Sequence, residues 1–449
     1  MARTARTQLS QPIFHEPVFG ADGSLPDPTG FSTQHPSDSA LYKQIGDLSK
    51  KEVVPVPKSR MAANEMFELA TAYGSHGPQV VKKITDAGHV VFHAFGDSGA
   101  SNSGKYANEL RVADQVTLDS GSAAEADRAA FLYHLGDIVY NFGEARYYYD
   151  QFYEPFRNYP APIFAIPGNH DSFIVPYTKP ADAPLTIFQR NFCSPTNRIT
   201  PEAGSLHRTA MTQPGIYFTL DAPFVRIIGL FSNALEDPGV ISNLDKKWPA
   251  VSNVQIEFLQ AQLERIKQEK FAGAVLIATH HPPFSYAPPK KNGGSGGNHG
   301  CSTAMLQQID DVCQKVGVYP HAFLSGHAHN YQRYTRIINF GGKEFDVPFI
   351  VCGDGGHNVN SLVRPRRGEP AVEPHAGDDV MYLEGKKGGT KVKHLFLAKY
   401  DDHNYGYLRI FVDKQYLKIG FHQVGVGSLA QSRYDMVTVR LPDHHMVAN

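Results

Sequence analysis

The chain has 449 residues, 41% of them hydrophobic and 19% charged, which is typical of a large globular protein and not of a disordered or membrane-spanning one. Its 43 basic and 44 acidic residues nearly cancel, so no global field would draw it to nucleic acid or to an anionic membrane. We therefore expect no stable nucleic-acid partner, and any anionic ligand must be captured locally. The composition makes no prediction of the oligomeric state.

The first 60 residues or so are rich in Pro, Ser, Gly and Asp and show little periodicity, which predicts an extended arm or irregular cap. A positively charged start without a following apolar run lacks the pattern of a secretory signal, and no transmembrane helix is evident. As written, the sequence predicts a cytoplasmic protein, or an exported or periplasmic one if a leader has been removed. Residues Met61 to Tyr73 are predicted to form a short helix.

From His89 onward, short apolar runs bounded by Gly, Pro or Asp alternate with helical stretches, which indicates a layered α/β architecture. The predicted strands are His89 to Phe95, Phe131 to Leu135, Pro162 to Ile166, Ile216 to Leu220, Val225 to Leu230, Ala274 to Ala278, Ala322 to Leu324 and Phe349 to Val351. Three later runs predict antiparallel strands that close a sheet: His394 to Tyr400, Tyr405 to Val412 and Tyr416 to Phe421.

Two helices are predicted where apolar residues recur at helical spacing. The first carries Ile256, Leu259, Leu263 and Ile266 behind a possible cap at Asn253, and the second carries Met305, Ile309 and Val312. The four cysteines contain no CxxC pair, so they make neither a disulfide framework nor a zinc ribbon. We expect buried free thiols, with a bridge from Cys301 to Cys313 as the alternative.

Five segments place Asp, Asn or His directly after a predicted strand or within a glycine-bounded turn. They are GDSG at 96–99, GDIVY at 136–140, GNHD at 168–171, THHPP at 279–283 and GHAH at 326–329. Because loops at the carboxyl ends of strands converge on one crevice, these side chains are expected to meet. Carboxylates and an amide oxygen mixed with imidazoles suit Fe, Zn or Mn, whereas calcium prefers oxygen alone and structural zinc prefers thiolates.

In this order and spacing, GDxG, GDxxY, GNH(D/E), a strand ending in HxP and GHxH resemble the purple acid phosphatases, within the wider calcineurin-like metallophosphoesterase family. The wider family usually has DxH in the first motif, where this chain has Asp97, Ser98 and Gly99. Tyr140, three residues after Asp137, lies where purple acid phosphatases supply a tyrosinate. A phenol has a pKa near 10, so binding it as an anion calls for a strongly acidic cation such as Fe(III).

The resemblance implies a four-layer α/β/β/α sandwich of two mixed sheets flanked by helices. It implies an N-terminal extension at 1–88, a catalytic domain at 89–430 and a C-terminal tail at 431–449. It further implies Fe(III) plus a second divalent metal (Fe, Zn or Mn), with Asp137 as the bridge. One metal would be held by Asp97, Asp137, Tyr140 and His329, and the other by Asp137, Asn169, His280 and His327.

Further residues follow from the resemblance. His170 looks like the family's substrate-binding histidine, and His299 is similar to another histidine near the substrate. His281 fills a position that the family varies, so His280 is taken as the ligand. Arg333 is expected to support the site from outside the ligand set.

The implied activity is the hydrolysis of phosphate monoesters by a metal-bound hydroxide, as in an acid phosphatase acting on small-molecule phosphate esters. His170 would assist departure of the leaving group, and Asp137 and His299 complete the expected catalytic set. Two alternatives stay open. The same site could act on phosphodiesters, nucleotides or phosphorylated lipids, because the ligand set does not encode the leaving group. A non-catalytic metal-binding scaffold is the other alternative.

Overall fold

The computed structural model describes residues 40–51, 54–175, 179–204, 206, 208–236, 238–244, 246–286, 295–296, 303–364, 379–382 and 390–448. Two large sheets form its centre. The first has nine strands in the order β1 (Phe67–Glu68), β5 (Phe218–Ala222), β6 (Val225–Leu230), β7 (Ala274–Thr279), β9 (Ala322–Ser325), β11 (Lys343–Cys352), β10 (Tyr331–Phe340), β14 (Thr390–Asp401) and β13 (Asp379–Tyr382).

The second sheet has seven strands and also mixes parallel with antiparallel pairs. Its order is β18 (His445–Val447), β17 (Arg433–Arg440), β16 (Tyr416–Gln423), β15 (Gly406–Asp413), β2 (His89–Phe95), β3 (Leu132–His134) and β4 (Ile163–Ala165). Strands β2, β3 and β4 run parallel to one another, and so do β6, β7, β9 and β11 in the first sheet. A separate ribbon pairs β8 (Ser295–Gly296) with β12 (Val363–Arg364).

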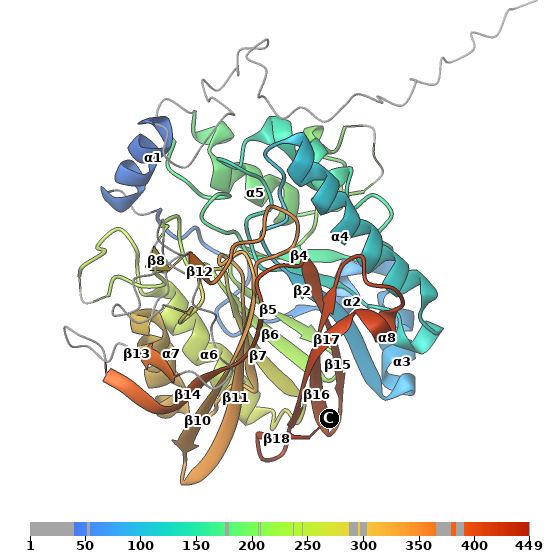
Figure 1. Ribbon diagram of the computed structural model, residues 1–449, viewed down its shortest axis with the longest axis vertical. Helices are drawn as coiled ribbons and strands as arrows, with labels where there is room; N and C mark the ends of the chain where they lie inside the picture. Colours follow the sequence, from blue (N-terminus) through green and yellow to red (C-terminus); the bar gives the residue numbers. More distant parts are fainter. Residues whose placement is uncertain are drawn as a thin grey trace, which may run out of the picture.

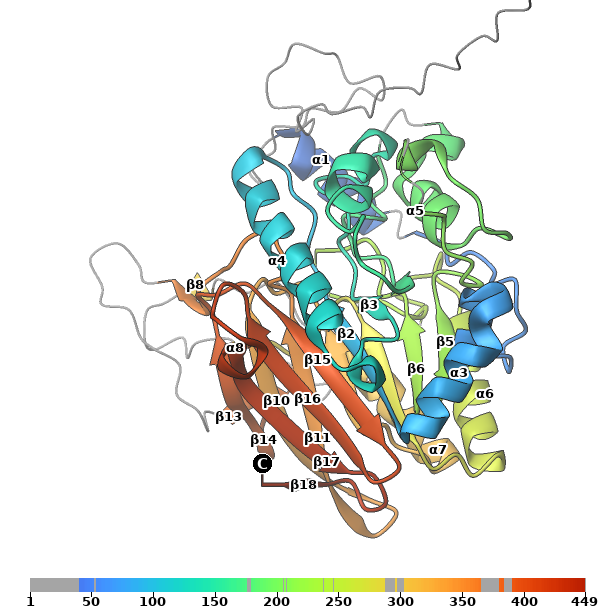
Figure 2. The ribbon, with the colours of Figure 1, turned by 90° about the vertical axis from the view of Figure 1, so that its right-hand side faces the viewer.

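Helices cover the outer faces of both sheets, as Figures 1 and 2 show. Helices α6 (Val254–Gln268) and α7 (Thr303–Val316) pack on each other beside the nine-stranded sheet, while α3 (Gly77–Ala87) contacts β2 and α4 (Ser103–Ser122) contacts β15. The remaining helices are α1 (Ala40–Lys51), α2 (Leu69–Ala72), α5 (Pro184–Phe192) and α8 (Leu429–Ser432). The predicted four-layer sandwich of two mixed sheets flanked by helices is confirmed.

Aromatic side chains fill the space between the two sheets. The ring of Tyr331 on β10 stacks on Phe421 of β16 with centroids 4.0 Å apart, and Tyr133 on β3 lies against Phe218 of β5. These four side chains are almost fully buried. Because burying a large apolar side chain stabilises a fold by roughly 1.5–3 kcal/mol, this inter-sheet layer holds the two halves of the sandwich together.

Most predicted elements are present. Strands β2 and β6 have the predicted bounds, and the apolar stripe of α6 is buried at Leu259, Leu263 and Ile266. Asn253 precedes α6 as predicted, but its side chain makes no capping bond and instead accepts from the amide of Asn243. Cys193, Cys313 and Cys352 are buried free thiols, and Cys301 lies outside the described residues.

Several elements differ from the sequence predictions. The segment Met61 to Tyr73 contains β1 and α2 in place of one helix, and α3 was not predicted. Residues 433–447, which the resemblance assigns to a tail, form β17 and β18 and extend the seven-stranded sheet. Within the described ranges, no helix is both long and apolar enough to cross a membrane.

Candidate metal centre

The five motif segments meet at one edge of the sandwich because each follows the carboxyl end of a parallel strand. Asp97 comes two residues after β2, Asp137 three residues after β3, and His327 two residues after β9. At all three residues the backbone turns sharply into the left-handed region, with φ of 59°, 59° and 68°. These turns direct side chains from both sheets toward one point.

The first half of the site surrounds the phenol of Tyr140. Its oxygen lies 2.8 Å from Oδ2 of Asp137, 3.0 Å from Oδ1 of Asp97 and 3.2 Å from Nε2 of His329. Nε2 of His329 is in turn 3.3 Å from Oδ1 of Asp97. Gln151 clamps the backbone of Tyr140, because its amide accepts from the Tyr140 N–H at 2.8 Å and donates to the Tyr140 carbonyl at 2.7 Å.

The second half of the site centres on the side-chain oxygen of Asn169. Nε2 of His280 lies 3.0 Å from this oxygen and Nδ1 of His327 lies 3.1 Å from it. Oδ2 of Asp137 is 3.4 Å from Nε2 of His280. Ligand atoms of Asp137, His280 and His327 all lie within 4.8 Å of one another, which is compact enough to hold a metal ion. Asp137 therefore belongs to both halves.

Main-chain carbonyls orient the two imidazoles. Nδ1 of His280 is 2.9 Å from the carbonyl of Leu135, and Nε2 of His327 is 2.8 Å from that of Glu236. A carbonyl only accepts, so these outer nitrogens donate. In neutral rings the inner nitrogens would then be the acceptors that face the site, which is the arrangement that metal-binding histidines adopt.

Burial and neighbouring charges set the protonation of these side chains. Burial opposes ionisation of Asp137, but the neighbouring His280 and His170 outweigh burial and lower the pKa of Asp137 well below its usual value. Burial lowers the pKa of His280, and the charge of Asp137 overcomes this and raises that pKa to about 9. Burial is the main reason that the pKa of Tyr140 is raised well above 10, and the negative charges of Asp137 and Asp97 raise it further. A cation that enters must therefore replace protons on His280 and Tyr140.

Asp171 supports the turn that carries Asp137. Its carboxylate accepts from the amides of Ile138, Val139 and Gly168 at 2.9–3.2 Å. Gly168 must be glycine here, because a Cβ at this position would lie 2.0 Å from Oδ1 of Asp137 and 2.5 Å from its nitrogen. The two turns that carry the candidate ligands Asp137 and Asn169 thus pack closely against each other.

The other predicted residues have distinct positions. Nδ1 of His170 is 2.5 Å from the carbonyl of Asn141, and its Nε2 is 4.0 Å from Oδ2 of Asp137. His281 bonds to Ser232 and Leu235, and its ring centroid lies 4.3 Å from that of His327. Arg333 pairs with Asp435 of β17 at 2.6 and 3.1 Å, so its expected support of the site is corrected to a bond between the two sheets. His299 lies outside the described residues.

Two residues beside the site were not predicted. The ring of His357 stacks on Tyr140 with centroids 3.5 Å apart, and Lys105 from the first turn of α4 contacts His357 at 2.6 Å. The signal for His357 was present, because GDGGHN at 353–358 is another glycine-bounded turn after a strand. Lys105 had no comparable signal, since a lysine on a helix is normally solvated.

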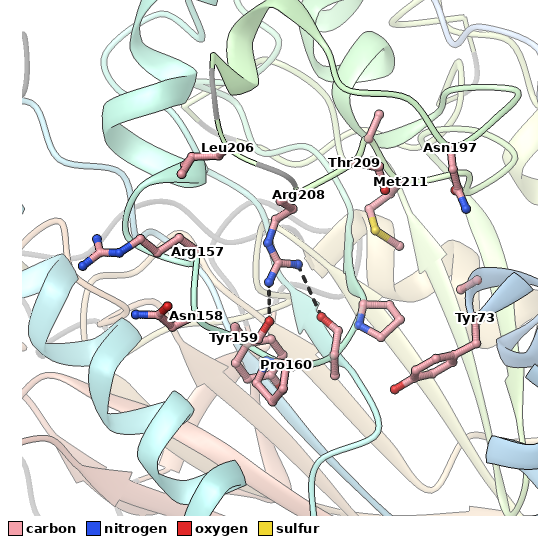
Figure 3. A pocket seen from close by; sticks show the side chains of 14 residues that line it. Tyr73, Arg157, Asn158, Tyr159, Pro160, Asn197, Leu206, Arg208, Thr209 and Met211 are labelled. Atoms are coloured by element: carbon pink, nitrogen blue, oxygen red, sulfur yellow. Dashed lines mark hydrogen bonds between the residues drawn. The ribbon is translucent and has the colours of Figure 1, made fainter. Parts of the chain in front are cut away.

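A cavity of about 620 Å³ lies elsewhere, beside the residues that precede β4. Figure 3 shows its lining, in which Arg208 points toward the main chain of residues 159–161. Arg208 donates to the carbonyls of Phe156, Tyr159 and Ala161. The lining includes none of the candidate ligands, so this cavity is separate from the metal centre.

Comparison with known proteins agrees with the geometry. The calcineurin-like phosphoesterase family matches residues 89–331, more than half of the chain and the span that contains all five motifs. Among solved structures, the "Structure of PhoD" is 12% identical with a TM-score of 0.43, covering 80% of this chain and 71% of that one. A conserved uncharacterized protein from Streptococcus pneumoniae TIGR4, titled a predicted phosphoesterase, is 11% identical with a TM-score of 0.28, covering 78% and 98%.

At these scores neither structure carries an argument about function, and no curated protein matches the chain. The family match, by contrast, extends over both ligand-bearing sheets. The chain belongs to the calcineurin-like phosphoesterase family.

Proposed function

We propose that this protein hydrolyses phosphate monoesters at a dinuclear centre of the purple acid phosphatase type, which holds Fe(III) and a divalent Fe, Zn or Mn. The observation that carries the proposal is the position of the Tyr140 oxygen, within 3.2 Å of Asp97, Asp137 and His329 atoms. Two carboxylates, a phenol and one imidazole make a hard, anionic donor set, which suits a trivalent cation.

The second metal would be held by Asp137, Asn169, His280 and His327. One carboxylate, one amide oxygen and two oriented imidazoles fit a divalent first-row cation. When bound, the two cations would neutralise charge on the phosphoryl group and supply an activated water. The shared carboxylate of Asp137 would keep the two positions adjacent.

His170 is proposed to contact the phosphoryl group and to assist the leaving group. Its Nδ1 donates to the carbonyl of Asn141, so Nε2 is the nitrogen that faces the site. From Nε2 a protonated imidazole would pass its proton to the departing ester oxygen. Phe173 and Tyr140 pack against the same ring and hold its orientation.

The test combines a spectrum with turnover. The purified protein is loaded with iron in air, its visible absorption is recorded, and hydrolysis of an aryl phosphate is compared with that of a bis-aryl phosphate. A tyrosinate-to-Fe(III) charge-transfer band together with faster monoester turnover supports the proposal. Colourless iron-loaded protein contradicts the ferric site, and preferential diester turnover contradicts the substrate class.

A further inference from the structure

Lys105 places a positive charge beside the candidate metal centre. Its Nζ is 2.6 Å from Nε2 of His357, whose ring lies almost parallel to that of Tyr140, at 19° and 3.5 Å between centroids. The same imidazole ring lies 5.2 Å from that of His329. Lys105 is therefore separated from the Tyr140 side of the centre by a single imidazole ring.

The partner of Lys105 is neutral. Nδ1 of His357 is 2.6 Å from the carbonyl of Gly99 and must donate to it, so Nε2 accepts a hydrogen bond from the Lys105 ammonium. In the part of the chain that the structure describes, no carboxylate pairs with Lys105.

A half-buried ammonium with only a neutral partner loses part of its hydration, and a nearby anion would offset that loss. One of its three N–H groups is used on His357, and two remain to donate. Lys105 also lies in the first turn of the 20-residue helix α4, where the helix dipole favours negative charge. The charge and the helix end therefore both favour an anion at this rim of the centre.

We propose that Lys105, held by His357, contacts the phosphoryl group of the substrate and selects doubly charged phosphate monoesters over singly charged diesters. The proposal rests on the proposed phosphatase function. A monoester carries up to two negative charges near neutral pH, because its second pKa is about 6, while a diester carries one. An extra cation at the rim stabilises the more highly charged ligand more strongly.

The primary experiment measures the binding of inorganic phosphate to the metal-loaded protein by calorimetry, for wild type, Lys105→Gln and Lys105→Arg. Loss of a charge-assisted hydrogen bond should weaken phosphate binding about tenfold in the Gln variant, and Arg should restore most of it. The matched control is Lys315→Gln on α7, a helical lysine that also bonds to a neutral acceptor, the side-chain oxygen of Gln260. The control should bind phosphate like wild type.

Selectivity is measured on the same variants as kcat/KM for an aryl phosphate and a bis-aryl phosphate. In Lys105→Gln we expect the monoester value to fall about tenfold and the diester value by less than about threefold. Equal losses on both esters overturn the selectivity. Unchanged phosphate affinity in a Lys105→Gln protein with full metal content overturns the proposed contact.

Failure of the proposed function gives a different result. If metal-loaded wild type hydrolyses neither ester, the phosphatase proposal fails, yet a tenfold weaker phosphate affinity in Lys105→Gln would still support the contact. If wild type binds no phosphate at all, the inference about Lys105 fails as well.

Discussion

The phenol oxygen of Tyr140 lies 2.8 Å from Oδ2 of Asp137, and the two residues are three positions apart in the turn that follows β3. The turn that carries them folds the phenol back over the carboxylate and brings it within 3.0 Å of Asp97 from the neighbouring strand. In the metal-free protein this arrangement keeps the phenol protonated, because burial and the two carboxylates raise the pKa of Tyr140 well above 10. A cation must compensate both carboxylates before the phenolate forms.

Tyr140→Phe is expected to abolish visible absorption in the iron-loaded protein, because the charge-transfer donor is lost. The measurement is the absorption spectrum at equal iron content. Tyr133→Phe is the matched control: its hydroxyl is buried, makes no hydrogen bond and lies between the sheets, so the band should persist. A coloured Tyr140→Phe protein would show that another residue supplies the band.

Asp137→Ala is expected to reduce metal content at both positions, because its carboxylate belongs to both halves of the site. Asp97→Ala should reduce metal content chiefly in the Tyr140 half, since Oδ1 of Asp97 contacts Tyr140 and His329, whereas its Oδ2 accepts from the main-chain amide of His327. Elemental analysis after dialysis gives the metal-to-protein ratio for each variant. Retention of one tightly bound metal in Asp137→Ala would contradict the bridging assignment.

Gly168→Ala tests the contact between two ligand turns. The new methyl group would lie 2.0 Å from Oδ1 of Asp137, so the turns must separate, and we expect a loss of about 2 kcal/mol or more in unfolding free energy. Gly121→Ala is the control. Its Cβ meets open space within α4, and it should raise stability by about 0.5–1 kcal/mol through helix propensity. Denaturant titration of both metal-free variants checks these values, and an unchanged Gly168→Ala would refute the close approach.

The pH dependence of stability is expected to depend on His321. Burial lowers its pKa from 6.5 to about 4, so between these values the unfolded chain binds a proton that the folded chain does not. The stability is therefore fully present above pH 6.5 and declines as the pH falls toward 4. For this one group the loss between pH 6.5 and about pH 5 is about 2 kcal/mol.

His321→Gln should remove that loss without removing the hydrogen bonds. Nδ1 of His321 accepts from the amide of Val275 and Nε2 donates to the carbonyl of Leu441, and a glutamine amide can do both. Urea unfolding at both pH values gives the comparison. If wild type and His321→Gln lose the same stability on acidification, His321 is not the titrating group.

The sequence predicted the candidate site better than it predicted the sheet edges. Polar residues placed directly after buried strands are a local pattern, and parallel strands bring such residues together whatever the loops between them do. The eight predicted residues from Asp97 to His329 that the structure describes all gather at one edge for this reason. Their metal-binding roles stay a prediction.

Elements without a continuous apolar run were harder to predict. Strand β10 reads YQRYTRIINF and β17 reads RYDMVTVR, so each mixes polar with apolar residues and is buried over only part of its length. Helix α3 has an apolar stripe of Val80, Val81 and Ile84, but the stripe is short and only partly buried. His357 and Lys105 escaped prediction because their importance comes from a ring stack and a hydrogen bond between distant segments, which no local pattern encodes.

The left-handed backbone at Asp97, Asp137 and His327 limits how this chain can be engineered for stability. Each such conformation costs a residue with a Cβ roughly 1 kcal/mol, which glycine would avoid. However, Asp97→Gly and Asp137→Gly would also remove the carboxylates that accept from the buried amides of His327 and His170. Replacing these residues with glycine to relax the backbone would therefore remove the candidate metal site together with hydrogen bonds that hold its turns.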